Sequence, residues 1–165
     1  MKHIVNFFLL TALLSSCSKQ TNDTSAYDAG MAKFEKNKAI ADKTYNLFIA
    51  RDLDGMMDMH SEDLIWSPAN TNDTLSKSAF RDGMAGWMSE FDAFSFENRQ
   101  YYPGVDENFI PDGSVRTYGT WIGTHKSGKQ TITKYYSVLQ FSDDGKVIAD
   151  LEYFDLGGVF DQLED

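Results

Sequence analysis

The chain has 165 residues, a formal net charge of -10 and a hydrophobic fraction of 42%. This length supports one domain with a sizeable core and leaves little room for a second. The acidic residues are scattered and no Lys/Arg block could follow a phosphate backbone, so we expect no nucleic-acid partner. The single cysteine excludes an intrachain disulfide.

The N-terminus has the layout of a secretory signal, with a lysine and a histidine before an apolar run over 4–14 and small residues after it. The run is too short to span a bilayer as a helix. Its end, the stretch LSSC, resembles the lipobox of bacterial lipoproteins, in which the cysteine becomes the acylated first residue. We therefore predict a lipoprotein signal peptide over 1–16 and lipid attachment at Cys17, which would anchor the protein to a membrane of the bacterial cell envelope. Ser18 resembles the outer-membrane default of lipoprotein sorting, and the alternative is an ordinary signal peptide cut nearby.

Residues 17–29 are polar, small and without periodicity, which is typical of a flexible tether, so the folded domain is expected over 30–165. Residues 31–51 indicate an amphipathic helix, because their large apolar residues recur at spacings of three, four and seven. These residues are Phe34, Ala41, Tyr45 and Phe48. Asp52 is the expected cap of a short second helix rich in methionine.

The stretch EDLIWSP predicts a short strand that Pro68 stops, because proline has no amide proton for a ladder. Ser76 or Thr74 caps a third helix, whose apolar face runs from Phe80 to Phe91. Most of the remaining chain reads as strands joined by glycine-containing turns that suit hairpins. Three helices followed by an antiparallel sheet predict an α+β fold in which the helices cover one face of the sheet.

This order of elements resembles the nuclear transport factor 2-like superfamily in its SnoaL-like branch. The resemblance covers about 31–163 and is carried by ARDLDGMMDMHSEDLIWSP and FSDDGKVIADLEYFDLGGVFDQL. It implies a cone-shaped, curved antiparallel or mixed sheet, a cystatin-like roll, covered by three N-terminal helices. Members such as ketosteroid isomerases, limonene epoxide hydrolases and polyketide cyclases bind a small, mostly apolar molecule inside the cone, whereas others are binding or dimerising modules. The fold alone does not decide between these functions.

The resemblance to ketosteroid isomerases implies a carboxylate base just before the proline that ends the first strand. That position holds Ser67, and a hydroxyl cannot replace a carboxylate as a general base. The helical tyrosine that donates to the oxyanion falls at Thr44 or, after a slip of one residue, at Tyr45. Steroid isomerisation is therefore not expected.

The resemblance to epoxide hydrolases implies an arginine between two aspartates. Glu152 takes the place of one acid without a gap in the match. The Arg-x-Asp pair falls at Arg116 and Tyr118 or at Tyr118 and Thr120, so neither register supplies the second carboxylate. Epoxide hydrolysis of that type is not expected either.

The strand predicted around Glu152 has two unlike faces. Val147, Ala149, Leu151 and Tyr153 form an apolar face, and Ile148, Asp150, Glu152 and Phe154 form a mixed one. Acids on strands are usually solvated, which would leave both carboxylates in water. Alternatively, because both sheet faces can be covered in SnoaL-like folds, the mixed face lines the cavity and the apolar face forms a dimer surface. Burial would then raise the pKa of Glu152 and make it the catalytic acid or base, assisted by Asp150 or His125.

The histidines give no metal signature, because no pair has ligand spacing, and we expect neither a metal nor a cofactor. His60 lies at a predicted helix end, where the helix dipole favours a cation, so a structural role is the default. His125 lies at a hairpin mouth, and a surface turn and a pocket rim both stay open for it.

Two functions remain open from the sequence. The first is a lipid-anchored protein that binds, and in one version transforms, a small apolar or amphipathic molecule. Its candidate pocket residues are Tyr45, Trp66, Trp87, Phe91, Tyr118, Thr120, Tyr135 and Phe154. Aromatic residues are more often simply core, although their number here exceeds what a small core needs. The second function is a non-catalytic homodimer serving as an accessory module of the envelope. A cavity of several hundred Å³ holding Glu152 would favour the first, and a filled interior with an apolar outer sheet face the second.

Overall fold

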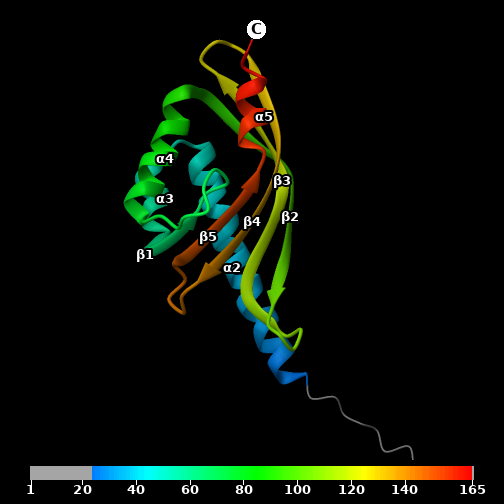
Figure 1. The fold of residues 1–165 in the computed structure, drawn as a ribbon. Helices are drawn as coiled ribbons and strands as arrows, with labels where there is room; N and C mark the ends of the chain where they lie inside the picture. The colour runs from blue at the N-terminus through cyan, green and yellow to red at the C-terminus, as the bar shows by residue number, and fades with distance from the viewer. Residues whose placement is uncertain (1–23, 165) are drawn as a thin grey trace, which may run out of the picture.

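The computed structural model describes residues 24–164 (Figure 1). Its elements are α2 (Ser25–Ile49), α3 (Leu53–Asp58), β1 (His60–Ser67), α4 (Lys77–Glu90), β2 (Phe91–Val105), β3 (Pro111–His125), β4 (Gln130–Phe141), β5 (Val147–Phe154) and α5 (Leu156–Asp161). The predicted signal peptide and the lipid attachment site at Cys17 lie outside the described residues. Among residues 24–164, no helix is both long and apolar enough to cross a membrane.

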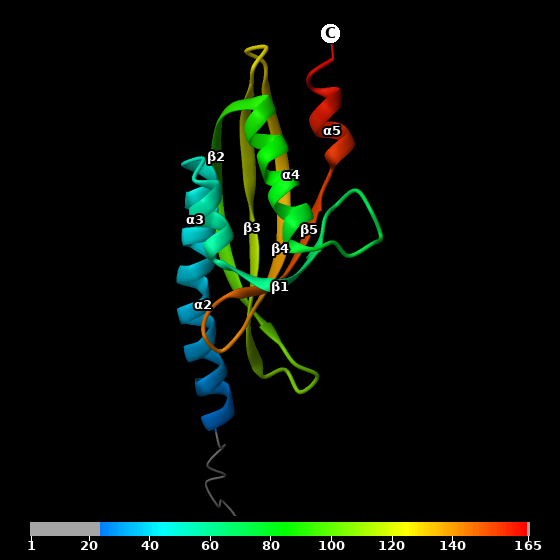
Figure 2. The same ribbon diagram turned by 90° about the vertical axis from the view of Figure 1, so that its left-hand side faces the viewer.

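The five strands form one curved sheet in the order β1-β5-β4-β3-β2. The pair β1–β5 is parallel and the other pairs are antiparallel, so the sheet is mixed. The helices α2, α3 and α4 lie on the same side of the sheet, with α2 running along its length (Figure 2). This arrangement confirms the α+β class and the curved sheet covered by three helices. The short helix α5 was not predicted.

The helix α2 begins within the segment predicted to be a tether. Its first residue is Ser25, and Gly30 packs so closely on β3 that an added Cβ would lie 1.9 Å from the Pro111 carbonyl oxygen. The predicted apolar stripe of this helix is buried, with exposed fractions of 0–7% at Phe34, Ala41, Tyr45 and Phe48. The tether boundary at residue 29 is therefore corrected: residues 25–29 are exposed, and they form the first turn of the helix that packs on β3 from Gly30 onward.

Two predicted caps are present at the helices that cover the sheet. The Asp52 side chain accepts from the Gly55 amide at 2.9 Å, and Ser76, rather than Thr74, accepts from the Ala79 amide at 3.4 Å. Each cap satisfies an amide that the first helical turn leaves without a partner. Both helices thus begin where the sequence indicated.

His60 is the first residue of β1 and lies in the core, 2% exposed. Its ring packs on Phe80 at 4.7 Å between centroids, and its Nδ1 lies 2.8 Å from the Met56 carbonyl oxygen. Burial lowers the pKa of His60 to about 4, since removing a charged imidazolium from water is costly. The expected structural role fits this position, but it rests on a neutral ring in the core instead of a cation at a helix end.

Candidate functional site

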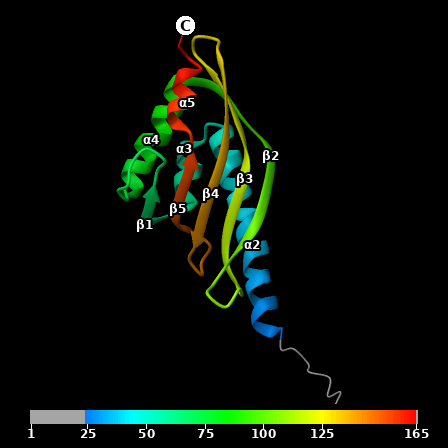
Figure 3. The ribbon, with the colours of Figure 1, turned by 45° about the vertical axis from the view of Figure 1, so that its right-hand side comes forward.

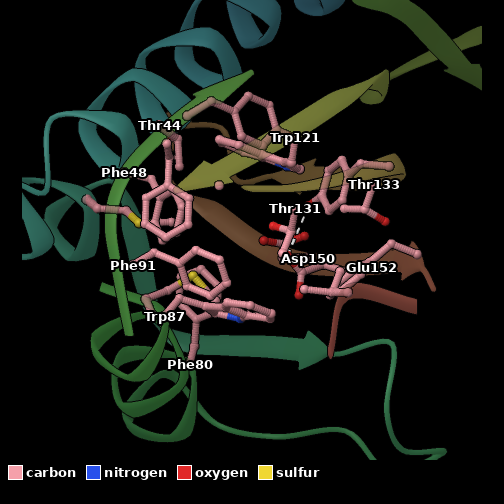
Figure 4. A pocket seen from close by; sticks show the side chains of 18 of the residues that line it. Thr44, Phe48, Phe80, Trp87, Phe91, Trp121, Thr131, Thr133, Asp150 and Glu152 are labelled. Carbon is pink, nitrogen blue, oxygen red and sulfur yellow. Dashed lines mark hydrogen bonds between the residues drawn. The ribbon is translucent and has the colours of Figure 1, made fainter. Parts of the chain in front are cut away.

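A cavity of about 80 Å³ lies between the helices and the inner face of the sheet. Its walls are aromatic and methionine side chains from α2, α3, α4 and the strands. Figure 4 shows the rings of Phe48, Trp87 and Phe91 on one side and the carboxylates of Asp150 and Glu152 next to each other on the other side. The cavity therefore combines apolar walls with one acidic spot.

Both carboxylates come from the inner face of β5. Asp150 and Glu152 are two residues apart, so the strand turns them to the same side. Asp150 is 5% exposed and Glu152 is half-buried. Of the two arrangements considered for this strand, the mixed face lines the cavity, and the opposite face carries the half-exposed Tyr153.

Glu152 accepts hydrogen bonds from the two neighbouring strands. The Trp66 Nε1–H of β1 donates to Oε2 at 2.9 Å, and the Tyr135 hydroxyl of β4 donates to Oε1 at 3.0 Å. Burial raises the pKa of Glu152, while these two donors lower it by stabilising the charged form, and the net direction is upward. The pair of donors also fixes the position of the carboxylate.

Asp150, unlike Glu152, lacks a hydrogen-bond donor at one of its carboxylate oxygens within the described residues. Its Oδ1 is buried and has no hydrogen-bond partner among residues 24–164. Burial first, and repulsion by the Glu152 charge second, raise the pKa of Asp150 well above its ordinary value. Two donors stabilise the charged form of Glu152, whereas Asp150 Oδ1 has none among the described residues, so the charged form is less favoured at Asp150 than at Glu152. The site thus holds two buried carboxyl groups in unlike surroundings.

Two buried tyrosines extend the polar part of the site. The Tyr45 hydroxyl from α2 lies 2.7 Å from Ser137 Oγ, and Ser137 faces Glu152 across the β4–β5 ladder. Burial raises the pKa of both Tyr45 and Tyr135, and the nearby carboxylate charges raise it further. Both hydroxyls therefore stay neutral and can act as hydrogen-bond donors at the edge of the cavity.

Small residues allow the aromatic walls to close around the cavity. Phe96 of β2 stacks on Trp121 of β3 with centroids 4.3 Å apart, and a Cβ at Gly119 would lie 2.2 Å from the Phe96 ring. On the helical side, a Cβ at Gly83 of α4 would lie 2.8 Å from the Trp66 ring. Gly83 thus lets α4 pack against Trp66, which donates to Glu152, and Gly119 lets the Phe96 ring lie flat on β3.

Most of the predicted pocket residues reach the cavity. Tyr45, Trp87, Phe91, Tyr135 and Phe154 line it together with Asp150 and Glu152. Trp66 does not line it but holds Glu152 through its indole N–H. His125 lies outside it, near Glu90 at the end of α4, with 3.9 Å between Nε2 and Oε2.

Tyr118 and Thr120 are corrections, because both lie on the outer face of the sheet. They pair with Tyr136 and Lys134 of β4, whereas Gly119 pairs with Tyr135, which lines the cavity. The inner residues of β3 are consequently the odd-numbered ones. Trp121, one of the aromatic residues that the sequence offers for a cavity wall, also lines the cavity, whereas Phe94, Thr131 and Thr133 were not predicted. Counting back by two from Tyr135 along β4 would have found Thr133 and Thr131.

No group of three or more metal-ligating side chains occurs in the described part of the chain. The titratable side chains that line the cavity are the carboxyl groups of Asp150 and Glu152 and the hydroxyls of Tyr45 and Tyr135.

We predict that Asp150→Asn stabilises the fold at neutral and alkaline pH. Because the folded-state pKa of Asp150 lies above that of the unfolded chain, the unfolded chain loses this proton first as the pH rises. The free energy of unfolding of the wild type should therefore fall as the pH rises from about 4 through the folded-state pKa. The advantage of the variant should grow from near zero at pH 4 to about 1–3 kcal/mol at pH 8, the usual cost of a buried polar group without a partner.

Urea unfolding at several pH values measures this difference, and Asp92→Asn on the exposed part of β2 is the matched control. The control should follow the wild type at every pH. Equal pH dependence of the wild type and Asp150→Asn would mean that Asp150 ionises as an ordinary solvated acid.

The comparisons with known proteins agree with the fold described above. The family of SnoaL-like domains matches residues 41–149, and a comparison with curated proteins finds no match. A candidate polyketide cyclase from Xanthomonas campestris pv. campestris has a TM-score of 0.66 at 12% identity, covering 80% of this chain and 99% of that one. The epoxide hydrolase/cyclase-like enzyme SalBIII, described for pyran ring formation in the polyether salinomycin, has a TM-score of 0.63 at 15% identity, with 75% and 94% covered. AusH from Aspergillus nidulans has a TM-score of 0.62 at 17% identity, with 74% and 85% covered.

At these identities the solved structures show that the fold is shared, and a shared reaction does not follow from a shared fold. The family match is stronger evidence for membership, because it spans more than half of the chain. It includes the C-terminal part of α2, the helices α3 and α4, the first strand and most of the sheet. The chain therefore belongs to the SnoaL-like domain family, within the nuclear transport factor 2-like superfamily.

Proposed function

We propose that this protein binds a small apolar or amphipathic molecule in the cavity and transfers a proton on it with Glu152 and Asp150. The observation that carries the proposal is the carboxylate pair in an apolar cavity, one member held by two donors and the other buried with an unpartnered oxygen. Carboxylates are rarely buried without a partner, and such burial costs stability. Strongly shifted pKa values in a cavity are typical of catalytic groups.

The positions of the two groups suit a simple proton transfer. The Glu152 carboxylate takes a proton from an acidic C–H or O–H of the bound molecule, and the O–H of Asp150 donates a hydrogen bond to the oxygen that becomes negative. Aromatic walls exclude water and strengthen both interactions. The Tyr45 and Tyr135 hydroxyls keep the polar side of the cavity hydrogen-bonded throughout.

A carbon acid tests this proposal directly. The bicyclic ketone 2-tetralone exchanges its acidic C–H protons for deuterium in D2O, and NMR follows the rate. We expect the wild type to accelerate the exchange and Glu152→Gln to lower the acceleration by about 100-fold or more, the usual contribution of a general base. Asp150→Asn should lower it as well, because it removes the acidic O–H.

Glu97→Gln is the matched control, since Glu97 is an exposed carboxylate on β2 and does not line the cavity. It should exchange the ketone as fast as the wild type. A wild type no faster than buffer, or a Glu152→Gln variant as fast as the wild type, would overturn the proposed proton transfer.

We further propose that the protein is held at a membrane of the bacterial envelope, in the outer membrane, by a lipid on Cys17. The support is the stretch LSSC after an apolar run, followed by Ser18. The described fold begins at Ser25, so a lipid at Cys17 would tether the domain to the membrane through the start of α2. The cavity lies at the other end of α2, at Thr44, Tyr45 and Phe48, and would face away from the anchor.

Fractionation of cells that produce the wild type or Cys17→Ser tests the anchor. The wild type should sediment with membranes and take up labelled palmitate, and the variant should do neither. Membrane association and labelling that persist in Cys17→Ser would contradict the proposal.

The outer face of the sheet supports a second function, a homodimer. Four tyrosines form a ladder across β2, β3, β4 and β5, with neighbouring ring centroids 5.8, 4.7 and 5.5 Å apart. They are Tyr102, Tyr118, Tyr136 and Tyr153, and three of them are 43–53% exposed. Ile132 of β4, 58% exposed, adds to this apolar face, and tyrosine is enriched in protein interfaces. A second copy of the chain would cover it without closing the cavity on the opposite side.

Light scattering on the purified protein tests the dimer. The wild type should have twice the mass of one chain, and Tyr118→Lys should shift it to one chain by placing a charge in the centre of the apolar face. Tyr27→Lys is the matched control, because Tyr27 is an exposed tyrosine on α2, away from the ladder. A monomeric wild type, or a dimer that survives Tyr118→Lys, would contradict this assembly.

A further inference from the structure

The cavity beside the carboxylates is small for a ligand site. Its volume of about 80 Å³ compares with about 300–1,000 Å³ for pockets that enclose small molecules. The cavity around Glu152 is therefore smaller than the several hundred Å³ that would favour a ligand pocket over a filled interior. A molecule with a long apolar chain that reaches the carboxylates must extend beyond this cavity.

A second hollow of about 390 Å³ lies next to it, between α4, α5 and the end of the β3–β4 hairpin. Figure 3 shows α5 beside α4 at this end of the sheet. The helix α4 supplies Gly83, Gly86 and Trp87, and the C-terminal segment supplies Phe160 and Leu163. The hollow is open to solvent and mostly apolar, with Glu90 and His125 as its polar residues.

The two cavities share walls. Trp87 and Phe91 line both of them, and α5 turns Val159 into the inner cavity and Phe160 into the outer hollow. The Trp87 ring stacks on Phe160 at 6.1 Å and lies 6.4 Å from Phe154 of the inner cavity. A single layer of side chains thus separates the carboxylate cavity from the outer hollow. A ligand that occupies both cavities must displace the shared side chain of Trp87 or Phe91.

The position of α5 is fixed by its last residues and its cap. The Gln162 amide accepts from the Ile132 amide at 2.8 Å and donates to the Ile132 carbonyl at 3.3 Å. These are the backbone groups of β4 that β5 no longer reaches after Phe154. Asp155 caps the helix by accepting from the Gly158 amide at 2.9 Å. Phe160 and Leu163 are therefore held over the hollow by specific contacts.

We propose that the outer hollow is a second subsite, which takes the apolar extension of the molecule whose polar end reaches Asp150 and Glu152. The inference rests on the proposed function of the inner cavity. The ligand class that fits is a neutral amphipathic molecule, with a hydroxyl or carbonyl at one end and an apolar chain or ring at the other. An anionic tail fits poorly, because Glu90 lies at the hollow and the carboxylate pair at the inner end.

Two phenols of different length test the subsite. 4-Ethylphenol has the polar group and a short chain, and 4-hexylphenol adds four methylene groups. In the wild type, calorimetry should give a dissociation constant for 4-hexylphenol about 100-fold lower, the gain expected when these methylenes are buried. The variant Gly86→Leu fills the hollow, because an added Cβ at Gly86 meets nothing within 4 Å. It should bind 4-ethylphenol like the wild type and lose the gain for 4-hexylphenol.

Two further variants complete the experiment. Ala85→Leu is the matched control, since it adds the same side chain to the neighbouring position of α4, which lines neither cavity, and it should keep the gain. Phe160→Ala removes a wall of the hollow at a residue that is 51% exposed, and it should reduce the gain several-fold with little effect on folding. A gain that survives both Gly86→Leu and Phe160→Ala would overturn the subsite and leave the inner site intact. Failure of both phenols to bind the wild type would overturn the subsite and ligand binding in the inner cavity together.

Discussion

The burial of two carboxylates on one face of β5 is the constraint around which the site is built. A strand repeats its direction every second residue, so Asp150 and Glu152 enter the interior together or leave it together. The strand order places β5 between β1 and β4, and each neighbour contributes one donor to Glu152, Trp66 from β1 and Tyr135 from β4. The parallel β1–β5 pair, the exception in an otherwise antiparallel sheet, is thus what brings an indole N–H to the acid.

Asymmetry between the two acids follows from the same sheet. Glu152 lies opposite Ser137, in a polar row that also contains Tyr45, whereas Asp150 lies opposite the apolar Leu139. The position nearer the start of the strand is therefore the less solvated one, and its proton is held more tightly. The proposed roles of Asp150 as donor and of Glu152 as acceptor rest on this difference in packing.

The sequence predicts helices better than strand faces in this chain, for a physical reason. The large apolar residues of α2 recur at helical spacing and are buried, so these core positions can be read from the sequence. Both faces of β3 carry aromatic residues, Trp121 inside and Tyr118 outside, so alternation cannot say which face is the inner one. The inner face is decided by cross-strand register with Tyr135, which is tertiary information. A slip of one residue reverses every assignment, as the positions of Tyr118 and Thr120 illustrate.

Segments at the ends of the domain were harder to predict because their local signals are weak. The helix α5 contains two glycines in six residues, and it is held by the Gln162 contacts to β4 instead of by helix propensity. Residues 25–29 carry no apolar pattern, yet they continue a helix whose later turns pack on β3. In both places a long-range contact outweighs the local preference of the sequence. The outer hollow could not be predicted from the sequence either, because α5 forms one of its walls and the position of α5 depends on the same long-range contacts.

Side chains on a strand alternate between the two faces of the sheet, so the proposed pocket and the proposed dimer surface use different residues. Inner and outer positions of β4 are neighbours along the chain, with Tyr135 contacting Glu152 and Tyr136 stacking on Tyr118 and Tyr153. The two faces therefore share no side chains. A ligand on the helical side and a second copy on the tyrosine ladder, both proposed above, would not compete for the same residues.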